Sequence, residues 1–309
     1  MIKYYYKSLR TAELQELDDF KRGTWVYVES PSLGELATLS EKFKLDPGIL
    51  EDALDEDEVP RLEKDDGISY VLIRFAYRSD RGDIETAPVL IMFGGEYVIT
   101  ISKQHLPALD YLQSGRLPFA TTQRAKLILL ILSHISDQYD VFINLTSRKI
   151  KAIRSRLRGN GIRNQDFIDF ATIEDELNEF LASLQPNNST LRRLLVGKHI
   201  PLYEEDQDLV EDLMLNNDQS IEASRSNLRG IENIRDAYSA IAANNLNRII
   251  MILTIATILV ALPNVFFGMY GMNISLPGQH AHWMFAALLG VNAFLIALIL
   301  IVARKKRII

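Results

Sequence analysis

The chain has 309 residues, of which 48% are hydrophobic and 24% charged, and this globular average excludes collagen-like and disordered chains. It contains no Cys, which excludes disulfides, thiolate metal sites and a cysteine nucleophile. The formal net charge of −6 argues against nucleic acid as the main partner. However, all 40 acidic residues lie at or before Asp236, and no charged residue occurs from Ile249 to Ala303. Such a distribution is typical of a membrane protein with a large acidic soluble part.

Residues 1–117 predict a cytosolic α/β domain. Segments rich in Val, Ile, Tyr and Phe and bounded by Gly, Asp and Pro predict strands. Gly94-Gly95 predicts a tight hairpin between the last two of them. The expected strands are 24–28, 68–77, 86–93 and 96–102, with short helices at 33–43 and 47–54.

From Pro118 the pattern becomes helical, and residues 118–200 form a second cytosolic region with helices expected at 121–158 and 164–184. Gly159-Asn160-Gly161 marks the break between these two helices. The stretch from Leu202 to Leu262 holds no Pro and a single Gly, so one helix is expected to run from the cytosolic part into the membrane. Sixty residues at 1.5 Å each span roughly 90 Å, a length that requires support from copies of the same helix.

Two apolar segments predict membrane-spanning helices at 249–268 and 283–303, because about 20 apolar residues cross the hydrocarbon core. A pair of buried helices in a soluble core is the disfavoured alternative. The loop between the spans, 269–282, has no Lys or Arg, whereas the tail 304–309 is basic. The positive-inside rule therefore places both termini in the cytoplasm, with 201–248 as the cytosolic stalk.

One stripe of the first span is small or polar while the rest is Ile, Leu, Val and Phe. Its two rows each repeat every seven residues and lie three residues apart. Helix–helix packing explains Ala and Gly in such a stripe, but buried Asn side chains in lipid demand partners or water. A pore lining is the alternative interpretation. The rows are Asn247, Thr254, Ala261 and Gly268, and Ile250, Thr257, Asn264 and Gly271.

The first span ends in Tyr270-Gly271-Met272-Asn273. This motif, between two C-terminal spans and after a long helix, resembles the signature of the CorA family of divalent-cation transporters. The resemblance covers the architecture of essentially the whole chain, and in sequence it is clear from Asp212 to Asn273. It implies a funnel-shaped homopentamer around one pore, with an α/β cytosolic domain and a long helical stalk.

The resemblance also assigns roles to individual residues. Asn273 would form a ring at the outer mouth, and a filter of Gly271, Met272 and Asn273 would hold hydrated Mg²⁺ through neutral oxygens. Asp236 would form an acidic ring at the cytosolic mouth. Ile250 and Leu253 resemble a hydrophobic gate. The full set of implied pore-lining positions is Asn247, Ile250, Leu253, Thr257, Ala261, Asn264 and Gly268.

Regulation by cytosolic cations is implied at subunit interfaces, where Asp212 matches one carboxylate of the family. A solvated helix charge is the alternative for Asp212. Its partner belongs near residue 78, which is Arg78 here, so Asp80 is the assigned partner, with Asp83 also close by.

The outer loop departs from the family pattern. It contains no acid, and Pro263 lies one place later than the usual proline. His280 and His282 are two residues apart and could contact zinc or nickel, or they are polar interfacial residues beside Trp283.

The leading hypothesis is a channel-like transporter that moves Mg²⁺, with Co²⁺ and Ni²⁺ as further candidates, into the cytoplasm across the cell membrane. The membrane potential supplies about 2.3 kcal/mol per charge per 100 mV, so no organic cofactor or ATP is needed. A Zn²⁺ transporter of the same fold, with proton coupling, is one alternative, although Met272 favours magnesium. A membrane-anchored cation sensor or scaffold is an alternative of another class. No catalytic constellation predicts an enzyme.

Overall fold

The computed structural model describes residues 1–309 apart from 11–12, 115–117, 158–163, 197–198, 279–280 and 307–309. Two compact units divide the chain, Met1–Glu232 and Asn233–Ile309.

Unit 1 is built on a seven-stranded sheet with the order β2-β1-β3-β7-β6-β5-β4. β3 and β7 pair in parallel, with Trp25 opposite Val98, and every other neighbouring pair is antiparallel. The strands are β1 (Ile2–Tyr6), β2 (Gln15–Leu17), β3 (Trp25–Glu29), β4 (Arg61–Asp65), β5 (Ile68–Arg78), β6 (Ile84–Phe93) and β7 (Val98–Ser102).

Two short helices, α1 (Leu33–Phe43) and α2 (Pro47–Asp52), cover one face of the sheet. Ser32 caps α1 by accepting a hydrogen bond from the backbone N–H of Glu35, whose carboxylate in turn accepts from the N–H of Ser32. Asp46 caps α2 by accepting hydrogen bonds from the backbone N–H groups of Gly48 and Ile49. Leu36, Leu39 and other apolar side chains of these helices form a closed core with alternate residues of the central strands.

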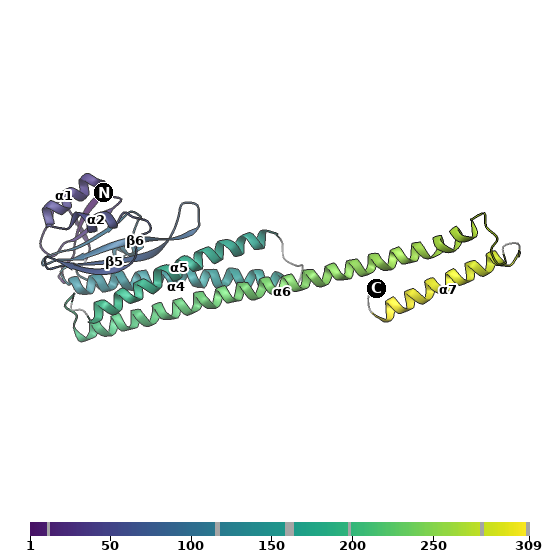
Figure 1. The fold of residues 1–309 in the computed structure, drawn as a ribbon. Coiled ribbons are helices and arrows are strands. Elements are labelled where there is room, and N and C mark those ends of the chain that lie inside the picture. Colours follow the sequence, from purple (N-terminus) through teal and green to yellow (C-terminus); the bar gives the residue numbers. More distant parts are fainter. Residues whose placement is uncertain (11–12, 115–117, 158–163, 197–198, 279–280, 307–309) are drawn as a thin grey trace. The chain divides into compact units, whose positions relative to one another are not determined.

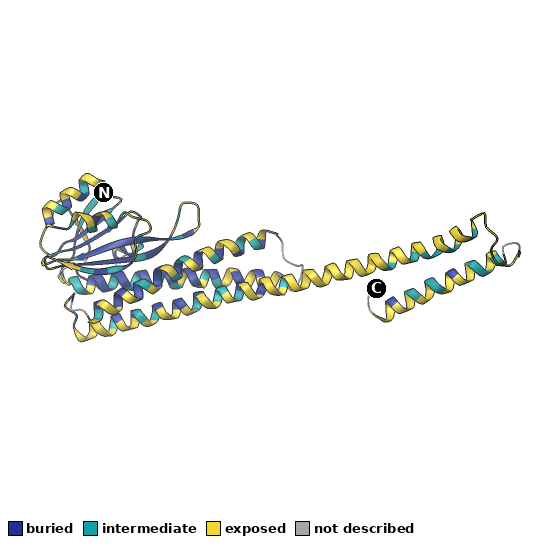
Figure 2. Cartoon of the chain, in the orientation of Figure 1, coloured by how far each residue is buried: buried dark blue, intermediate teal, exposed yellow. Residues whose placement is uncertain are grey.

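The other face of the sheet carries α4 (Arg124–Leu157) and α5 (Asn164–Val196), while α3 (Pro107–Gln113) packs against α4. Figure 2 shows the buried stripes that both long helices turn towards the sheet. α5 continues past Leu184, where the sequence analysis expected it to end, and it holds Pro186 inside the helix. Tertiary bonds hold this second half in place, because the carboxamide of Asn187 bonds to the backbone of Arg74 on β5.

The longest helix, α6 (Glu204–Tyr270), is continuous over 67 residues and confirms the single helix expected from the sequence. Within unit 1 its inward positions repeat at alternating steps of three and four residues, the pattern of a coiled-coil seam. The ends of this seam are apolar and its centre is polar. The seam consists of Val210, Leu213, Asn217, Ser220, Ser224, Asn227 and Ile231.

Hydrogen bonds to α4 satisfy most of the polar centre. Ser136 donates to Asn217 at 2.7 Å between oxygens, and Ser220 donates to Asp140. Ser147 and Asn227 bond each other at 2.8 Å and 3.1 Å. The offset along the chain stays at 80 or 81 residues, so the two helices run parallel in a fixed register.

Unit 2 contains the remainder of α6 and α7 (Met284–Lys305), which lie antiparallel as a hairpin (Figure 1). Both helices are long and apolar enough to cross a membrane. Their apolar stretches are almost wholly exposed in the single chain, as expected for surfaces that meet lipid or further copies.

The four strands expected from the sequence are confirmed as β3, β5, β6 and β7, and α1 coincides with its expected range. β1, β2 and β4 were not predicted. The expected break at 159–161 lies outside the described residues.

Candidate functional site

The small and polar stripe of the first span occupies one exposed face of α6. Ile250 in the stripe is 52% exposed, and Leu253 at its border is 65% exposed, which are large fractions for such side chains in a helical hairpin. Asn247, Thr257, Ala261, Asn264 and Gly268 are exposed as well.

A different face of α6 meets α7. Ile255, Leu259, Leu262, Phe266 and Tyr270 are half-buried, and they recur every three or four residues. At about 100° per residue, this face lies roughly half a turn around α6 from the polar stripe. Packing against α7 therefore does not account for the stripe, because the stripe faces away from α7.

The hydroxyls in the stripe are satisfied by their own helix. Thr254 donates to the carbonyl of Ile250 at 2.8 Å, and Thr257 donates to that of Leu253 at 2.9 Å. Such bonds let threonine face an apolar surrounding at little cost, while its oxygen remains available as an acceptor. By contrast, the carboxamides of Asn247 and Asn264 form no hydrogen bond within the described part of the chain, so they need water or another polar group.

The Gly-Met-Asn motif follows directly from the C-terminus of α6. The N–H of Gly271 donates to the carbonyl of Phe267 at 2.9 Å, and that of Met272 donates to Met269 at 3.3 Å. A Cβ at position 271 would lie 3.2 Å from the Phe267 oxygen, which favours glycine in this tight last turn. Asn273 comes immediately after the turn and is exposed.

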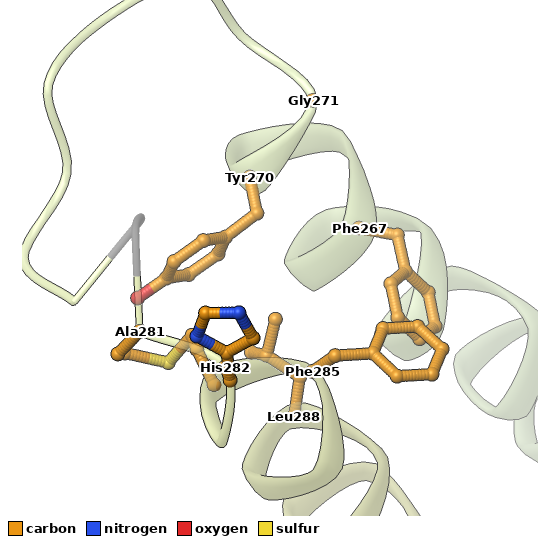
Figure 3. Close-up of a pocket in the computed structure, with 8 residues that line it drawn as sticks. Phe267, Tyr270, Gly271, Ala281, His282, Phe285 and Leu288 are labelled. Atoms are coloured by element: carbon orange, nitrogen blue, oxygen red, sulfur yellow. The ribbon is translucent and has the colours of Figure 1, made fainter.

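A shallow hollow of about 490 Å³ lies beside the motif, between the ends of the two helices (Figure 3). Phe267, Phe285 and Leu288 form its apolar wall, and His282 and Tyr270 lie across from them. The Tyr270 hydroxyl donates to the carbonyl of Pro277 at 3.2 Å, which ties the loop back to the helix end. His280 lies outside the described residues, so no His pair is described there.

The implied regulatory carboxylates occupy separate elements. Asp212 is exposed on α6, Asp80 is exposed in the turn between β5 and β6, and Asp236 is exposed on α6 in unit 2. Asp80 lines a hollow with Arg78, Arg81 and His105. Within the described residues of one chain, no group of three His, Asp or Glu side chains is arranged to hold a metal ion.

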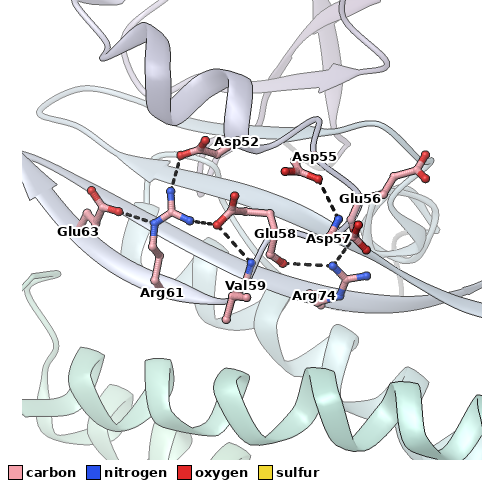
Figure 4. A network of polar contacts seen from close by, with 9 residues as sticks. All are labelled: Asp52, Asp55, Glu56, Asp57, Glu58, Val59, Arg61, Glu63 and Arg74. Carbon is pink, nitrogen blue, oxygen red and sulfur yellow. Dashed lines mark hydrogen bonds and ion pairs between the residues drawn. The ribbon is translucent and has the colours of Figure 1, made fainter.

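The densest run of acids, 51–58, is partly paired with basic side chains, among them Arg61 (Figure 4). Arg61 forms ion pairs with Asp52, Glu58 and Glu63. The guanidinium of Arg74 donates to the carbonyls of Glu56 and Glu58 at 2.6 Å and 3.1 Å. These contacts also explain β4: its charged residues form a strand because Arg61 ties the edge of the sheet to the acidic loop.

One charged cluster, around His105, was not predicted from the sequence. Its Nδ1 lies 2.8 Å from Glu29 and its Nε2 lies 2.9 Å from Asp110. Burial opposes the charged ring, but the hydrogen bonds of both carboxylates outweigh it and raise the pKa of His105. Asp110 is only five residues from His105, but Glu29 is 76 residues away, and the pairing of β3 with β7 brings it close.

Known proteins resemble this chain over most of its length. Residues 20–305 match the family described as "CorA-like Mg2+ transporter protein". The "Cobalt/magnesium transport protein CorA" of Methanocaldococcus jannaschii is 27% identical over 277 residues, covering 86% of each chain. The "Magnesium transport protein CorA" of Campylobacter jejuni (strain RM1221) is 22% identical and covers 91% of this chain and 90% of its own.

The fold resembles a solved structure over its whole length. The complete structure of the CorA magnesium transporter from Methanocaldococcus jannaschii superimposes with a TM-score of 0.86 at 22% identity, covering 99% of this chain and 98% of that one. The likeness confirms the expected architecture: an α/β domain, a long helix and C-terminal apolar helices.

Proposed function

Because the chain belongs to the CorA-like Mg²⁺ transporter family, we propose that it assembles as a homopentamer and conducts Mg²⁺ into the cytoplasm. The family is one of membrane transporters and not an enzyme class. The observation that carries the proposal is the position of the polar stripe, which is exposed and turned away from α7. Copies of α6 arranged around an axis would face one another through this stripe and leave α7 on the lipid side.

The stripe offers a graded path for a hydrated divalent ion. Asn264 and Thr257 supply neutral oxygens, which attract a cation without the strong hold of a carboxylate. Below them, Leu253 and Ile250 form an apolar constriction that closes by excluding water. At the outer end, Asn273 and the backbone of Gly271 would select the hydrated ion.

Regulation is proposed on the cytosolic side. Asp212 on one copy and Asp80 on its neighbour would bind a divalent cation between subunits and hold the pore closed. As cytosolic Mg²⁺ falls, repulsion between the unbridged carboxylates would favour the open state. Asp236 would concentrate cations at the inner mouth, and the basic tail, with both termini in the cytoplasm, fits this orientation.

Fluorescent-dye uptake in proteoliposomes tests the proposal, with Mg²⁺, Co²⁺ and Zn²⁺ compared in parallel. Wild type should take up Mg²⁺ under an inside-negative potential, and Co²⁺ uptake would agree with the name of the archaeal relative. Asn273→Ala should abolish uptake, whereas Ser275→Ala, an exposed polar change two residues away, should preserve it. Zn²⁺ flux driven by a proton gradient without Mg²⁺ flux would favour the zinc alternative, and no flux of any ion would favour a sensor or scaffold.

A further inference from the structure

Pro263 leaves one backbone acceptor of α6 without its helical partner. Proline has no N–H, so the carbonyl of Leu259, four residues earlier, receives no helical hydrogen bond. An unsatisfied carbonyl in a membrane span is costly, and neighbouring helices, polar side chains or ordered water normally satisfy it. Leu259 lies on the face of α6 that meets α7, so the partner must come from that side.

Asn292 is the polar group that α7 presents towards α6. It is only 4% exposed, in a helix whose other side chains are mostly open. Its amide nitrogen donates to the carbonyl of Leu288 at 2.9 Å, in its own helix. Its Oδ1 is buried and has no hydrogen-bond partner among the described residues.

Helical geometry places the Oδ1 of Asn292 and the carbonyl of Leu259 at a similar depth in the hairpin. Phe267 and Phe285 line one hollow and mark a common level of the antiparallel helices (Figure 3). From that level, Asn292 is seven residues along α7 and Leu259 is eight residues back along α6. At about 1.5 Å per residue, the two positions differ in height by roughly 1.5 Å.

We propose that Asn292 is a positioning residue for the pore helix: its Oδ1 and the carbonyl of Leu259 share one bridging water, which holds α6 against α7 where Pro263 interrupts the hydrogen bonds of the helix. Two acceptors cannot bond each other, but one water donates to both and is a common partner of buried polar groups. Pro263 separates Asn264 and Gly268 from Thr257 and Ile250 in the stripe. Asn292 would therefore set the angle between the outer and inner halves of the path.

The expected effect on Mg²⁺ uptake rests on the proposed function, whereas the contact between Asn292 and Leu259 does not. A double-mutant cycle tests it. Asn292→Leu removes one acceptor and leaves Leu259 unsatisfied, so Mg²⁺ uptake should fall roughly three- to tenfold, the effect of a hydrogen bond between membrane helices. Pro263→Ala restores the N–H that Leu259 lacks, so adding Asn292→Leu to Pro263→Ala should change uptake by less than about twofold. Val291→Leu, on the neighbouring exposed face of α7, is the matched control and should match wild type.

A spectroscopic readout separates positioning from a loss of folding. Because the chain has no Cys, spin labels can be placed on Ile249→Cys and Val302→Cys, both exposed, with labelled copies diluted by unlabelled ones. The distance distribution should shift in Asn292→Leu and remain unshifted when Asn292→Leu is added to Pro263→Ala. Equal shifts in both backgrounds, or none in either, would overturn the inference. If wild type shows no ion flux but the labels show the coupling, the pore proposal fails and the positioning role stands.

Discussion

Asn187 on α5 bonds both backbone groups of Arg74 on β5. Its Oδ1 accepts from the Arg74 N–H at 3.0 Å, and its Nδ2 donates to the Arg74 carbonyl at 2.8 Å. The carboxamide thus bonds the backbone of Arg74 as a neighbouring strand would, at a point of β5 that β4 does not reach. It also holds α5 against the sheet directly after Pro186, where the backbone of the helix lacks a donor.

Replacing this amide should destabilise the whole of unit 1. Asn187→Leu keeps the volume but leaves two half-buried backbone groups of Arg74 with fewer partners, which costs about 1–3 kcal/mol. Thermal unfolding of the full chain in detergent measures the loss, and Gln185→Leu, an exposed change on the same helix, should leave the midpoint unchanged. Equal midpoints for the two variants would show that the Asn187 bonds add no stability.

The polar centre of the α6 seam offers a matched pair of substitutions. Ser220 donates to Asp140, whereas the hydroxyl of Ser224 is buried without a hydrogen-bond partner among the described residues. Ser220→Ala should therefore destabilise the chain by about 1 kcal/mol, and Ser224→Ala should stabilise it by a similar amount. The same thermal unfolding experiment compares them. Shifts of the same sign would refute this assignment of the two hydroxyls.

The His105 cluster predicts a pH dependence of stability. The folded state raises the pKa of His105 above its ordinary value, so the protonated ring stabilises the fold below that ordinary value of about 6.5, and the contribution is lost as pH rises through the folded pKa. His105→Gln should remove this contribution, so that the free energy of unfolding falls less steeply between pH 6 and 8. Urea unfolding of wild type and His105→Gln across that range measures how the free energy of unfolding depends on pH. His134→Gln is the control, because burial lowers the pKa of His134 instead of raising it. A slope that persists in His105→Gln would assign it to another group.

The apolar constriction predicts a leak when it is made polar. Leu253→Ser should wet the proposed gate and raise Mg²⁺ uptake in the presence of high internal Mg²⁺, when wild type is closed. Ile252→Ser makes a similar change at nearly the same depth but off the stripe, and it should retain closure. If Ile252→Ser leaks as much as Leu253→Ser, general loosening of the membrane helices becomes the better explanation.

The sequence pattern predicted the elements whose residues are almost wholly buried or form a long uninterrupted helix. Strands β5 and β6 are almost wholly buried, so their apolar runs were clear, and the 67-residue helix α6 follows from the lack of internal breakers before Pro263. β4 was missed because its sequence, RLEKD, carries four charges, and its partners come from the acidic loop and from β5. α5 extended past Pro186 because Asn187 bonds to a strand more than 100 residues away in sequence, which no local pattern reveals.

The candidate site shows the same limit. The stripe on α6 was visible as a repeat of seven, since helical geometry alone places those residues on one face. The sequence did not show that the stripe lies opposite α7, because which face of α6 is covered depends on how the two helices pack. The His105 cluster and the burial of Asn292 depend on tertiary contacts in the same way.

The parallel pairing of β3 with β7 also governs how the chain reaches its fold. Trp25 meets its neighbour Val98 only after the 72 residues between them have been made, so the middle of the sheet closes late and β3 remains an open edge until then. Trp25 is fully buried in that central strand, and the other tryptophan, Trp283, lies at the start of α7. With Trp283 replaced by Phe, the emission of Trp25 would time the closure of the sheet, the slow event that this topology imposes on refolding.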